Sequence, residues 1–534
     1  MAEVDASRWR DALAARALAE IPRLLMLQDR VPVSATYGCF DRAYWHYRIM
    51  DFPSGMAQKL VLPLALAWSL DLPDNPYRGD PQIRDWVEAG IRFAARSAHK
   101  DGSCDDYYPF ERASGAAAFS LLACLDAAEI IGLVGDADVD GFFVRRARWL
   151  AAHEESGRLS NHEALICACL ARMGARYGAA WEAPLERRLQ RLLSWQSPEG
   201  WFDEYGGADP GYLTLTVAQL ADIDRRRPDL ALRPAIERAV GFLHAVQHPD
   251  GTFGGEYSNR ATVNYFPHGL EMLGAWLKLG PALNDRYWPT FAAGGAAAVS
   301  DDRLFGHHLT SWLLSWAAWQ PERPGAALLA SGRVLLPDAR LMMEGRDARR
   351  LYLGLSKGGA FRLFDGGRLA LADTGPSLRM EDGRVAVSHL EGSHYQVEDG
   401  RVLVSGSLAW AKSARLTPFK SVVLRTAMLS LGRFFPDLMR RALQKLLVTG
   451  REDAPFRFER ELRWDGGRLL ISDRIEAVNG WSHVAQAGIG GFQSSLTTVM
   501  ARAWEPAQVQ PWLDLTPRVR KLAPAEPLLV ERRA

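Results

Sequence analysis

Three stretches of the sequence share one design, and their spacing decides the fold: Asp101-Gly102, which leads to Tyr107 and Tyr108; Glu199-Gly200-Trp201-Phe202; and Asp250-Gly251-Thr252-Phe253-Gly254-Gly255. In each, a glycine follows an acidic residue, and aromatic residues come before a helix rich in small side chains. The last two lie about 50 residues apart and the first about twice that distance upstream, a period typical of stacked supersecondary units. Each unit is long enough for a helical hairpin. Because hairpins repeated around a ring form an α/α toroid, we predict this fold for the N-terminal part of the chain.

The same period predicts where the functional residues lie. A further unit is expected near Glu155-Ser156-Gly157, and another between Asp301 and Gly306. The turns between helices line one axial end of a toroid, and connecting segments carry binding and catalytic residues more often than the elements that they join. We therefore expect the site in these turns.

Helical patterns recur along this half, with interiors rich in alanine and leucine and mostly free of proline. Pro22 is expected to kink or split the first helix. The predicted helices cover residues 8–30, 55–70, 81–98, 113–132, 140–152, 161–174, 184–196, 211–223, 233–246, 263–279 and 306–319.

The pattern changes after the Pro-rich stretch 319–325. Short alternating runs follow, such as 384–387 and 401–404, and Asp-Gly turns separate them. Short strands with frequent turns are typical of a sandwich. We therefore predict an α+β multidomain chain with an incomplete α/α toroid over residues 1–322 and an antiparallel β-sandwich over residues 326–534.

One segment of the second half, residues 419–448, looks helical and basic, and Pro436 is expected to break it. Two interpretations stay open for it. A helix packed across a sheet is the one that we favour, and peripheral contact with a membrane surface is the other.

Composition narrows the function. The 534 residues carry a net charge of +1, so no global field indicates nucleic acid. The N-terminus lacks the basic and apolar regions of a signal peptide, which predicts a cytoplasmic protein. No stretch has the length and apolarity of a transmembrane helix. Five dispersed cysteines (39, 104, 124, 167 and 169) indicate buried, reduced thiols.

Asn161-His162 is the first candidate site. The pair lies where a turn becomes a helix, so Ser160 or Asn161 can serve simply as a helix N-cap. Alternatively, an amide and an imidazole directed into the ring bind a carboxylate, helped by the positive end of the helix.

Further candidates fall in turns farther round the ring. Tyr205 and Tyr212 flank a turn held by Gly and Pro, about 50 residues after Asn161. A single Tyr or His is more often structural, but a ring of such residues at equivalent turns predicts a binding site. The later turns contribute Tyr257, Asn259, Arg260, Asn264, His268 and His307.

Two other groups have competing interpretations. Arg42, Trp45 and His46 form either a sugar subsite at the open end of the ring or part of an aromatic plug. Asp105 and Asp106 are better interpreted as a solvated turn than as a catalytic carboxylate pair, because adjacent side chains diverge.

These residue types, without a metal motif or an acidic pair, favour proton abstraction next to a carboxylate. The C5 proton of a uronic acid is weakly acidic, and Asn, His or Arg that neutralises the carboxylate stabilises the enolate-like intermediate. A His or Tyr takes the proton, and a Tyr protonates the leaving O4 oxygen. The result is β-elimination, or C5 epimerisation if the proton returns to the opposite face.

On these residues the chain resembles the heparinase II/III-like polysaccharide lyases, which join an incomplete α/α toroid to an antiparallel β-sandwich in this order. An adjacent Asn and His, followed by a Tyr some 50 residues later, form the core of the site in that superfamily, and Asn161-His162 and Tyr212 match this arrangement. The resemblance implies a carbon–oxygen lyase without a cofactor that acts on a uronate-containing glycan. Asn161 would neutralise the carboxylate, His162 would assist as base or binder, and Tyr212 would be the catalytic acid or base, with Tyr205 as the rival for that role.

The chain departs from the family pattern in the β domain. The family often supplies another His from there, and the candidates here, His389 and His394, match neither in spacing nor in neighbours. No ligand cluster indicates the structural zinc of some relatives. Two alternatives stay open: a uronyl C5-epimerase that uses the same residues, and a non-catalytic glycan-binding protein of exopolysaccharide biosynthesis.

Overall fold

The structure is a computed structural model that describes residues 7–155, 157–299, 301–411, 417–436, 438–439, 451–492, 503–504 and 509–534. The predicted repeat is present in it as one recurring turn. Gly102, Gly200 and Gly251 have φ angles of 91°, 102° and 83°, a conformation that favours glycine. A Cβ atom on any of them would lie within 2.5 Å of the backbone of the next outer helix, at Arg146, Arg238 or Tyr287. The acidic-Gly pairs therefore mark close helix–turn contacts around the ring.

The helices form the predicted toroid. Six inner helices contact one another in a closed cycle: α3 (Val61–Ser69), α5 (Ser114–Ile130), α7 (Ser160–Tyr177), α9 (Pro210–Arg226), the short α11 (His268–Met272) and α13 (Asp302–Ala317). The outer helices are α1 (Ser7–Leu27), α4 (Pro81–Ser97), α6 (Ala137–Ala152), α8 (Glu182–Leu193), α10 (Arg233–Val246) and α12 (Leu279–Ala292). Inner helices such as α5 are buried along nearly their whole length, whereas outer helices such as α8 bury one stripe.

Proline misled the prediction in two places. α1 runs through Pro22 without a break. The predicted helix over 263–279 is limited to α11 and a following 3₁₀ turn (Leu273–Ala275), and α12 was not predicted because it contains Pro281 and Pro289. Pro281 lies in the first turn of α12, where no intrahelical partner for its missing N–H is needed.

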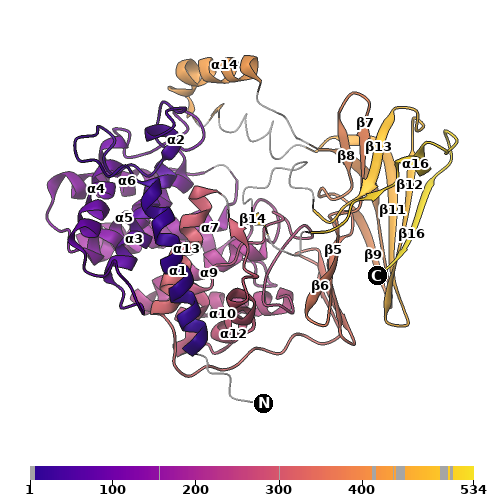
Figure 1. The fold of residues 1–534 in the computed structure, drawn as a ribbon, viewed down its shortest axis with the longest axis horizontal. Helices are drawn as coiled ribbons and strands as arrows, with labels where there is room; N and C mark the ends of the chain where they lie inside the picture. Colours follow the sequence, from indigo (N-terminus) through magenta and orange to yellow (C-terminus); the bar gives the residue numbers. More distant parts are fainter. Residues whose placement is uncertain are drawn as a thin grey trace.

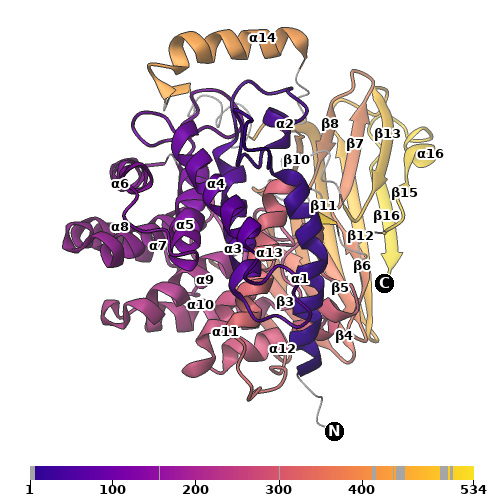
Figure 2. The same cartoon turned by 60° about the vertical axis from the view of Figure 1, so that its left-hand side comes forward.

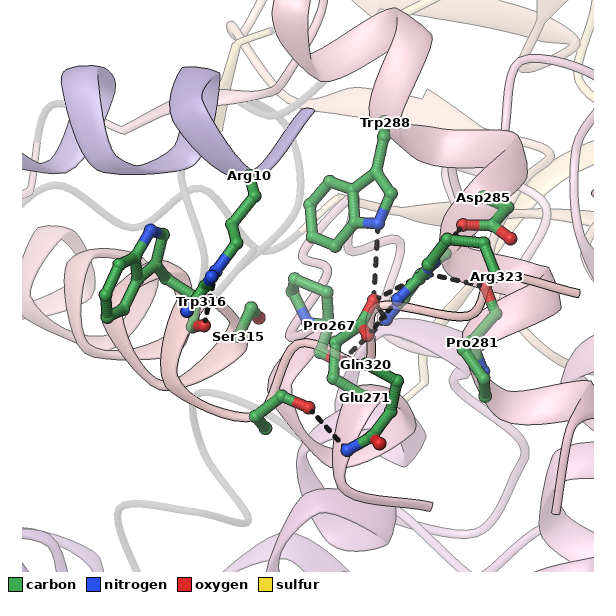
Figure 3. Close-up of polar contacts among 12 residues, drawn as sticks. Arg10, Pro267, Glu271, Pro281, Asp285, Trp288, Ser315, Trp316, Gln320 and Arg323 are labelled. Atoms are coloured by element: carbon green, nitrogen blue, oxygen red, sulfur yellow. Dashed lines mark hydrogen bonds and ion pairs between the residues drawn. The ribbon is translucent and has the colours of Figure 1, made fainter. Parts of the chain in front are cut away.

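The segment after α13 is anchored to the toroid by Arg323 (Figure 3). Its guanidinium donates to Glu271 Oε2 at 2.6 Å and to Asp285 Oδ1 at 2.8 Å, and it lies 4.1 Å from the centre of the Trp319 ring. Glu271 is fully buried and also accepts bonds from Asn284 and Trp288. Since a buried carboxylate needs such partners, this cluster fixes where the chain leaves the toroid.

The C-terminal half is the predicted antiparallel β-sandwich. The sheet nearer the toroid has the order β2-β3-β4-β5-β6, and the second sheet has the order β15-β13-β7-β8-β10-β11-β12-β16, with β9 paired to β10. The strands are β2 (Arg333–Leu336), β3 (Leu341–Arg346), β4 (Arg349–Gly354), β5 (Ala360–Asp365), β6 (Arg368–Asp373), β7 (Pro376–Met380), β8 (Val385–Val387), β9 (His394–Glu398), β10 (Arg401–Trp410), β11 (Asp453–Asp465), β12 (Arg468–Ala477), β13 (Val484–Ile489), β15 (Leu513–Asp514) and β16 (Leu528–Arg533). A separate pair joins β1 (Ala298–Val299) to β14 (Ala503–Trp504), and a short helix, α16 (Thr516–Val519), precedes β16.

The nearer sheet lies between the toroid and the second sheet (Figure 1), and its central strands β3, β4 and β5 are mostly buried. Met343, Tyr352 and Phe364 belong to the core shared with the helices, while their neighbours Met342 and Leu353 belong to the core of the sandwich. Side chains alternate between the two faces of a strand, so this sheet joins both cores.

Side chains of this sheet and its loops also brace the toroid segment 247–260. Tyr352 donates to Gln247 O at 2.6 Å, and Arg362 pairs with Glu256 at 3.1 Å. The buried Lys357 Nζ donates to the carbonyl oxygens of Ser258 and Asn259 at 2.8 and 3.1 Å. The β domain therefore fixes the loop that precedes Arg260.

In its described part, the basic segment does not pack across a sheet, so the interpretation that we favoured is wrong for these residues. Its described part contains α14 (Pro418–Ala427) and a π-helical turn (Met428–Gly432), while residues 437 and 440–448 of the predicted range lie outside the described residues. α14 lies over the toroid, near the short helix α2 (Arg42–Trp45) (Figures 1 and 2). Arg425 pairs with Asp51, and Arg433 lies over the ring of Phe110. Among the described helices, none is long and apolar enough to cross a bilayer.

Candidate active site

A cavity of about 300 Å³ opens at the N-terminal ends of the inner helices. Its lining includes Gly115 of α5, His162 of α7, Tyr212 of α9 and Arg303 of α13, each within the first turns of its helix. The N-terminus of a helix carries a partial positive charge and N–H groups without intrahelical partners. Several inner helices direct this end at one space, so the cavity suits an anionic ligand.

Asn161 lines the cavity with its amide already engaged. Its Nδ2 donates to Glu204 Oε1 at 2.9 Å, and Ser160 Oγ donates to Glu204 Oε2 at 2.9 Å. The Oδ1 atom of Asn161 is buried and has no hydrogen-bond partner. Burial raises the pKa of Glu204, although His162 and Arg260 act against this shift. Asn161 therefore offers an acceptor atom rather than a donor to a ligand.

His162 is oriented from two sides. Its Nδ1 lies 2.8 Å from Glu155 Oε2, so a carboxylate there accepts the Nδ1 proton and Nε2 becomes the basic nitrogen. The ring lies against Gly115, where a Cβ atom would come within 2.4 Å of Cε1. Gly115 thus leaves room for the imidazole at the cavity wall.

Tyr212 and Arg260 are held together by one buried carboxylate, that of Asp209. Its Oδ1 accepts from the Tyr212 backbone N–H at 3.0 Å and from Thr262 Oγ1 at 2.6 Å. Its Oδ2 accepts from the Arg260 backbone N–H at 3.1 Å and from Ser258 Oγ at 3.2 Å. Asp209 is the N-cap of α9, and it joins the start of that helix to the loop that carries Arg260.

The hydroxyl of Tyr212 and the guanidinium of Arg260 both line the cavity. Burial raises the pKa of the Tyr212 hydroxyl, so this group keeps its proton at neutral pH. The Arg260 guanidinium lies 4.3 Å from the centre of the Tyr205 ring. Among the described residues, no carboxylate oxygen lies within 4 Å of that guanidinium. Arg260 is therefore a cation without an ion-pair partner at the site.

Tyr205 also lines the cavity, in a strained turn. Its φ angle is 58°, which is uncommon for a residue with a side chain. Its backbone N–H donates to Arg158 O at 2.8 Å, and Asn259 Nδ2 donates to the Glu204 carbonyl oxygen. Asn259 thus supports the 204–208 turn and is not part of the cavity lining.

A second group of polar side chains lines the cavity wall. His307 is the one member of this group that was predicted as a site residue. Lys59 Nζ lies 2.5 Å from His307 Nε2, and burial lowers the pKa values of both groups. Asp106 accepts from Ser54 Oγ at 2.6 Å and pairs with Arg303 at 2.9 Å. The expectation of a solvated turn at Asp105 and Asp106 is wrong, because both are buried.

Several predicted site residues lie elsewhere. Tyr257 is buried against the β domain, where its hydroxyl bonds His248 Nε2 at 2.9 Å. Asn264 is buried, and His308 Nε2 lies 3.2 Å from its Oδ1. Arg42, Trp45 and His46 pack around α2, where Trp45 Nε1 donates to Leu27 O, and none of the three lines the cavity.

His268 lines a different cavity, of about 390 Å³, at the opposite ends of the inner helices. Its Nδ1 lies 2.8 Å from Ser311 Oγ. The two cavities share Lys59, Phe119, Leu215, Phe266 and His307, which separate them along the ring axis.

Neither of the two candidate histidines of the β domain, His389 and His394, lines the first cavity. His389 is buried near Lys357, and burial lowers its pKa to about 3. His394 lies on β9 and lines an open groove of the sandwich with Arg451 and Arg474. The described residues contain no group of His, Cys, Asp or Glu placed to hold a metal ion.

Sequence reasoning missed the carboxylates that orient the site. Glu155 lies seven positions before His162, in the interrupted repeat, and Glu204 lies beside Tyr205. Asp209 had a recognisable signal, since Asp-Pro-Gly before a helix is a typical N-cap with Pro at the first position.

No protein-family model matches the sequence, and no curated protein matches it. The chondroitin AC lyase of Streptomyces coelicolor A3, solved in complex with chondroitin sulphate, aligns with a TM-score of 0.55 at 11% identity, over 100% of this chain and 79% of that chain. A Paenibacillus xanthan lyase aligns with a TM-score of 0.53 at 9% identity, over 91% of this chain and 46% of that chain. The chain therefore shares the fold of these two polysaccharide lyases, and the predicted resemblance is confirmed at the level of the fold.

Proposed function

We propose that the protein is a polysaccharide lyase that cleaves a uronate-containing glycan by β-elimination in the first cavity. The observation that carries this proposal is Arg260, a cation without an ion-pair partner, held by Asp209 beside Tyr212. Helix N-termini add positive potential around it, and an anionic sugar satisfies both features. The fold shared with two polysaccharide lyases supports the same class of reaction.

In the proposed reaction, Arg260 binds the uronate carboxylate and stabilises the negative charge that develops when the C5 proton leaves. His162 Nε2 takes that proton, because Glu155 holds the ring with Nδ1 as the donor. The C4–O4 bond then breaks, a C4=C5 double bond forms, and Tyr212 gives its proton to O4. The raised pKa of Tyr212 suits this acid role, since the hydroxyl is protonated before the step.

Asn161 has a different part from the one that the resemblance implied. Its Nδ2 is occupied by Glu204, so we assign charge neutralisation to Arg260. The buried Oδ1 of Asn161 accepts a hydrogen bond from a hydroxyl of the bound sugar, which satisfies an otherwise orphaned atom.

The test is ultraviolet absorbance of the unsaturated uronate product on a panel of uronate polymers and oligosaccharides. We expect the absorbance to rise with the wild type and to stay flat with Tyr212→Phe. A flat trace for the wild type across the panel contradicts the proposal. Deuterium uptake at C5 without an unsaturated product would then indicate an epimerase, and sugar binding that survives Tyr212→Phe would indicate a binding protein.

A further inference from the structure

α14 presents its apolar side chains outward. Phe419, Val422 and Val423 follow the i, i+3, i+4 spacing of one helix face, and they are 77%, 63% and 51% exposed. No residue of α14 is fully buried. In α10 of the toroid, by contrast, Ile236, Val240 and Leu243 of the apolar stripe are all buried.

The apolar surface continues beyond the helix. Leu429, Leu431, Phe434 and Phe435 are each more than half exposed. Single exposed apolar residues are common on protein surfaces. Several large ones exposed close together in one segment indicate an interaction site. Figures 1 and 2 show α14 at the edge of the molecule, over the side of the toroid that carries α2.

The charges of the segment indicate which partner covers this surface. Residues 417–436 contain Lys420, Arg425 and Arg433 and no acidic residue. Arg425 pairs with Asp51, which anchors the helix to the toroid, whereas Lys420 is exposed. An apolar face flanked by basic side chains is the pattern of helices that lie in the interface of an anionic bilayer.

We infer that the outer face of residues 418–436, formed by Phe419, Val422, Val423, Leu429, Leu431 and Phe434, docks on an anionic lipid bilayer. The inner face of the same segment points to the candidate site, because Leu424 lines the first cavity. Docking in this way brings the cavity next to glycan carried at a membrane surface. The inference concerns binding and holds whether or not the proposed chemistry is correct.

Sedimentation with vesicles tests it, using the full chain and two compositions, phosphatidylcholine alone and phosphatidylcholine mixed with phosphatidylglycerol. We expect the wild type to sediment with the mixed vesicles and much less with the neutral ones. Phe419→Ser/Val423→Ser should weaken binding by about tenfold or more, since it removes two large apolar groups. Lys420→Gln should weaken it by about fivefold at low salt.

The matched control is Val33→Ser/Leu328→Ser, which removes two exposed apolar side chains far from this segment in sequence (94% and 87% exposed) and should bind like the wild type. If Phe419→Ser/Val423→Ser fails to fold by circular dichroism, Val422→Ser/Leu429→Ser replaces it. Equal binding to neutral and mixed vesicles, or none to either, overturns the inference. So does self-association that these substitutions abolish in the absence of vesicle binding, because a second copy then covers the face.

Discussion

The toroid has a cavity at each end of its ring, and the two differ mainly in how their charges are satisfied. At the C-terminal ends of the inner helices, Arg172 is buried between Asp126 and Asp222. Arg225 and Arg226 pair with Asp222 as well, and Arg226 also lies 3.9 Å from Glu129, so three arginines face three carboxylates. The rest of that wall is mostly apolar, with residues such as Leu122, Leu165 and Leu314. At the N-terminal ends, Arg260 has no carboxylate partner within ion-pair distance among the described residues, and Asn161 Oδ1 is unsatisfied.

This difference indicates which of the two cavities binds a polar ligand. A closed ion-pair network is already neutral, so it offers a polar ligand little to gain. An unpaired cation and an orphaned acceptor, beside an oriented imidazole, are incomplete until a ligand arrives. Both cavities are of similar size, and volume alone would not have separated them.

The largest expected effect is at Tyr212. Tyr212→Phe removes the proposed acid while keeping the ring, so kcat should fall by about 10²–10⁴-fold with an unchanged melting temperature. Steady-state kinetics on the best substrate of the panel measures this. Tyr177→Phe, at the C-terminal end of α7 where the hydroxyl bonds Asp140, should keep its activity and serves as the control. Equal losses in both variants would remove the functional distinction between the two ends.

Replacing one arginine by methionine at each cavity compares the two ends directly. Arg260→Met should lower kcat/KM by about 10²–10³-fold, because transition-state charge is left without its cation. Arg225→Met, at the other cavity, should change kcat/KM by less than about twofold, as exposed substitutions usually do. If Arg225→Met costs as much as Arg260→Met, the reaction does not depend on the unpaired cation.

Gly115→Ala tests whether the position of the His162 imidazole is critical for activity. The added Cβ would meet the imidazole at 2.4 Å, so the ring must move, and kcat should fall by about 10–100-fold. Gly241→Ala in α10 meets no atom within 4 Å and should leave kcat unchanged while raising stability slightly. Activity of Gly115→Ala equal to the wild type would show that the position of the imidazole is not critical.

The smallest expected effect concerns stability at the second cavity. Burial lowers the pKa of His268 to about 4, below its unfolded value of 6.5. The unfolded chain therefore binds more protons between these values, and stability should fall as pH decreases from 6.5 towards 4, by up to a few kcal/mol at this residue. Melting temperature against pH should be flatter for His268→Gln than for the wild type. Identical slopes would mean that His268 is not held neutral by burial.

Local sequence predicted the fold well where backbone geometry decides it. Gly102, Gly200 and Gly251 carry the repeat because only glycine fits both the left-handed turn and the close helix contact. α12 was missed because its prolines look like breakers until their positions in the helix are known. The direction of the apolar face of α14 depends on tertiary packing, which periodicity cannot reveal.

The candidate site was predicted in part for the same reason. Asn161, His162, Tyr205, Tyr212, Arg260 and His307 line the cavity, since helix starts in successive hairpins converge at one end of the ring. Glu155, Glu204 and Lys59 were missed because their roles arise only when ring closure brings separate turns together. The catalytic roles and the cytoplasmic location stay predictions.

The most direct test of the central claim is proton NMR of a uronate oligosaccharide incubated with the protein in deuterated water. The account predicts that the C5 proton signal disappears, that a signal from the proton on the new C4=C5 double bond appears at the same rate, and that Arg260→Met slows both. An intact C5 proton with the wild type, across every uronate tested, would contradict proton abstraction in this cavity.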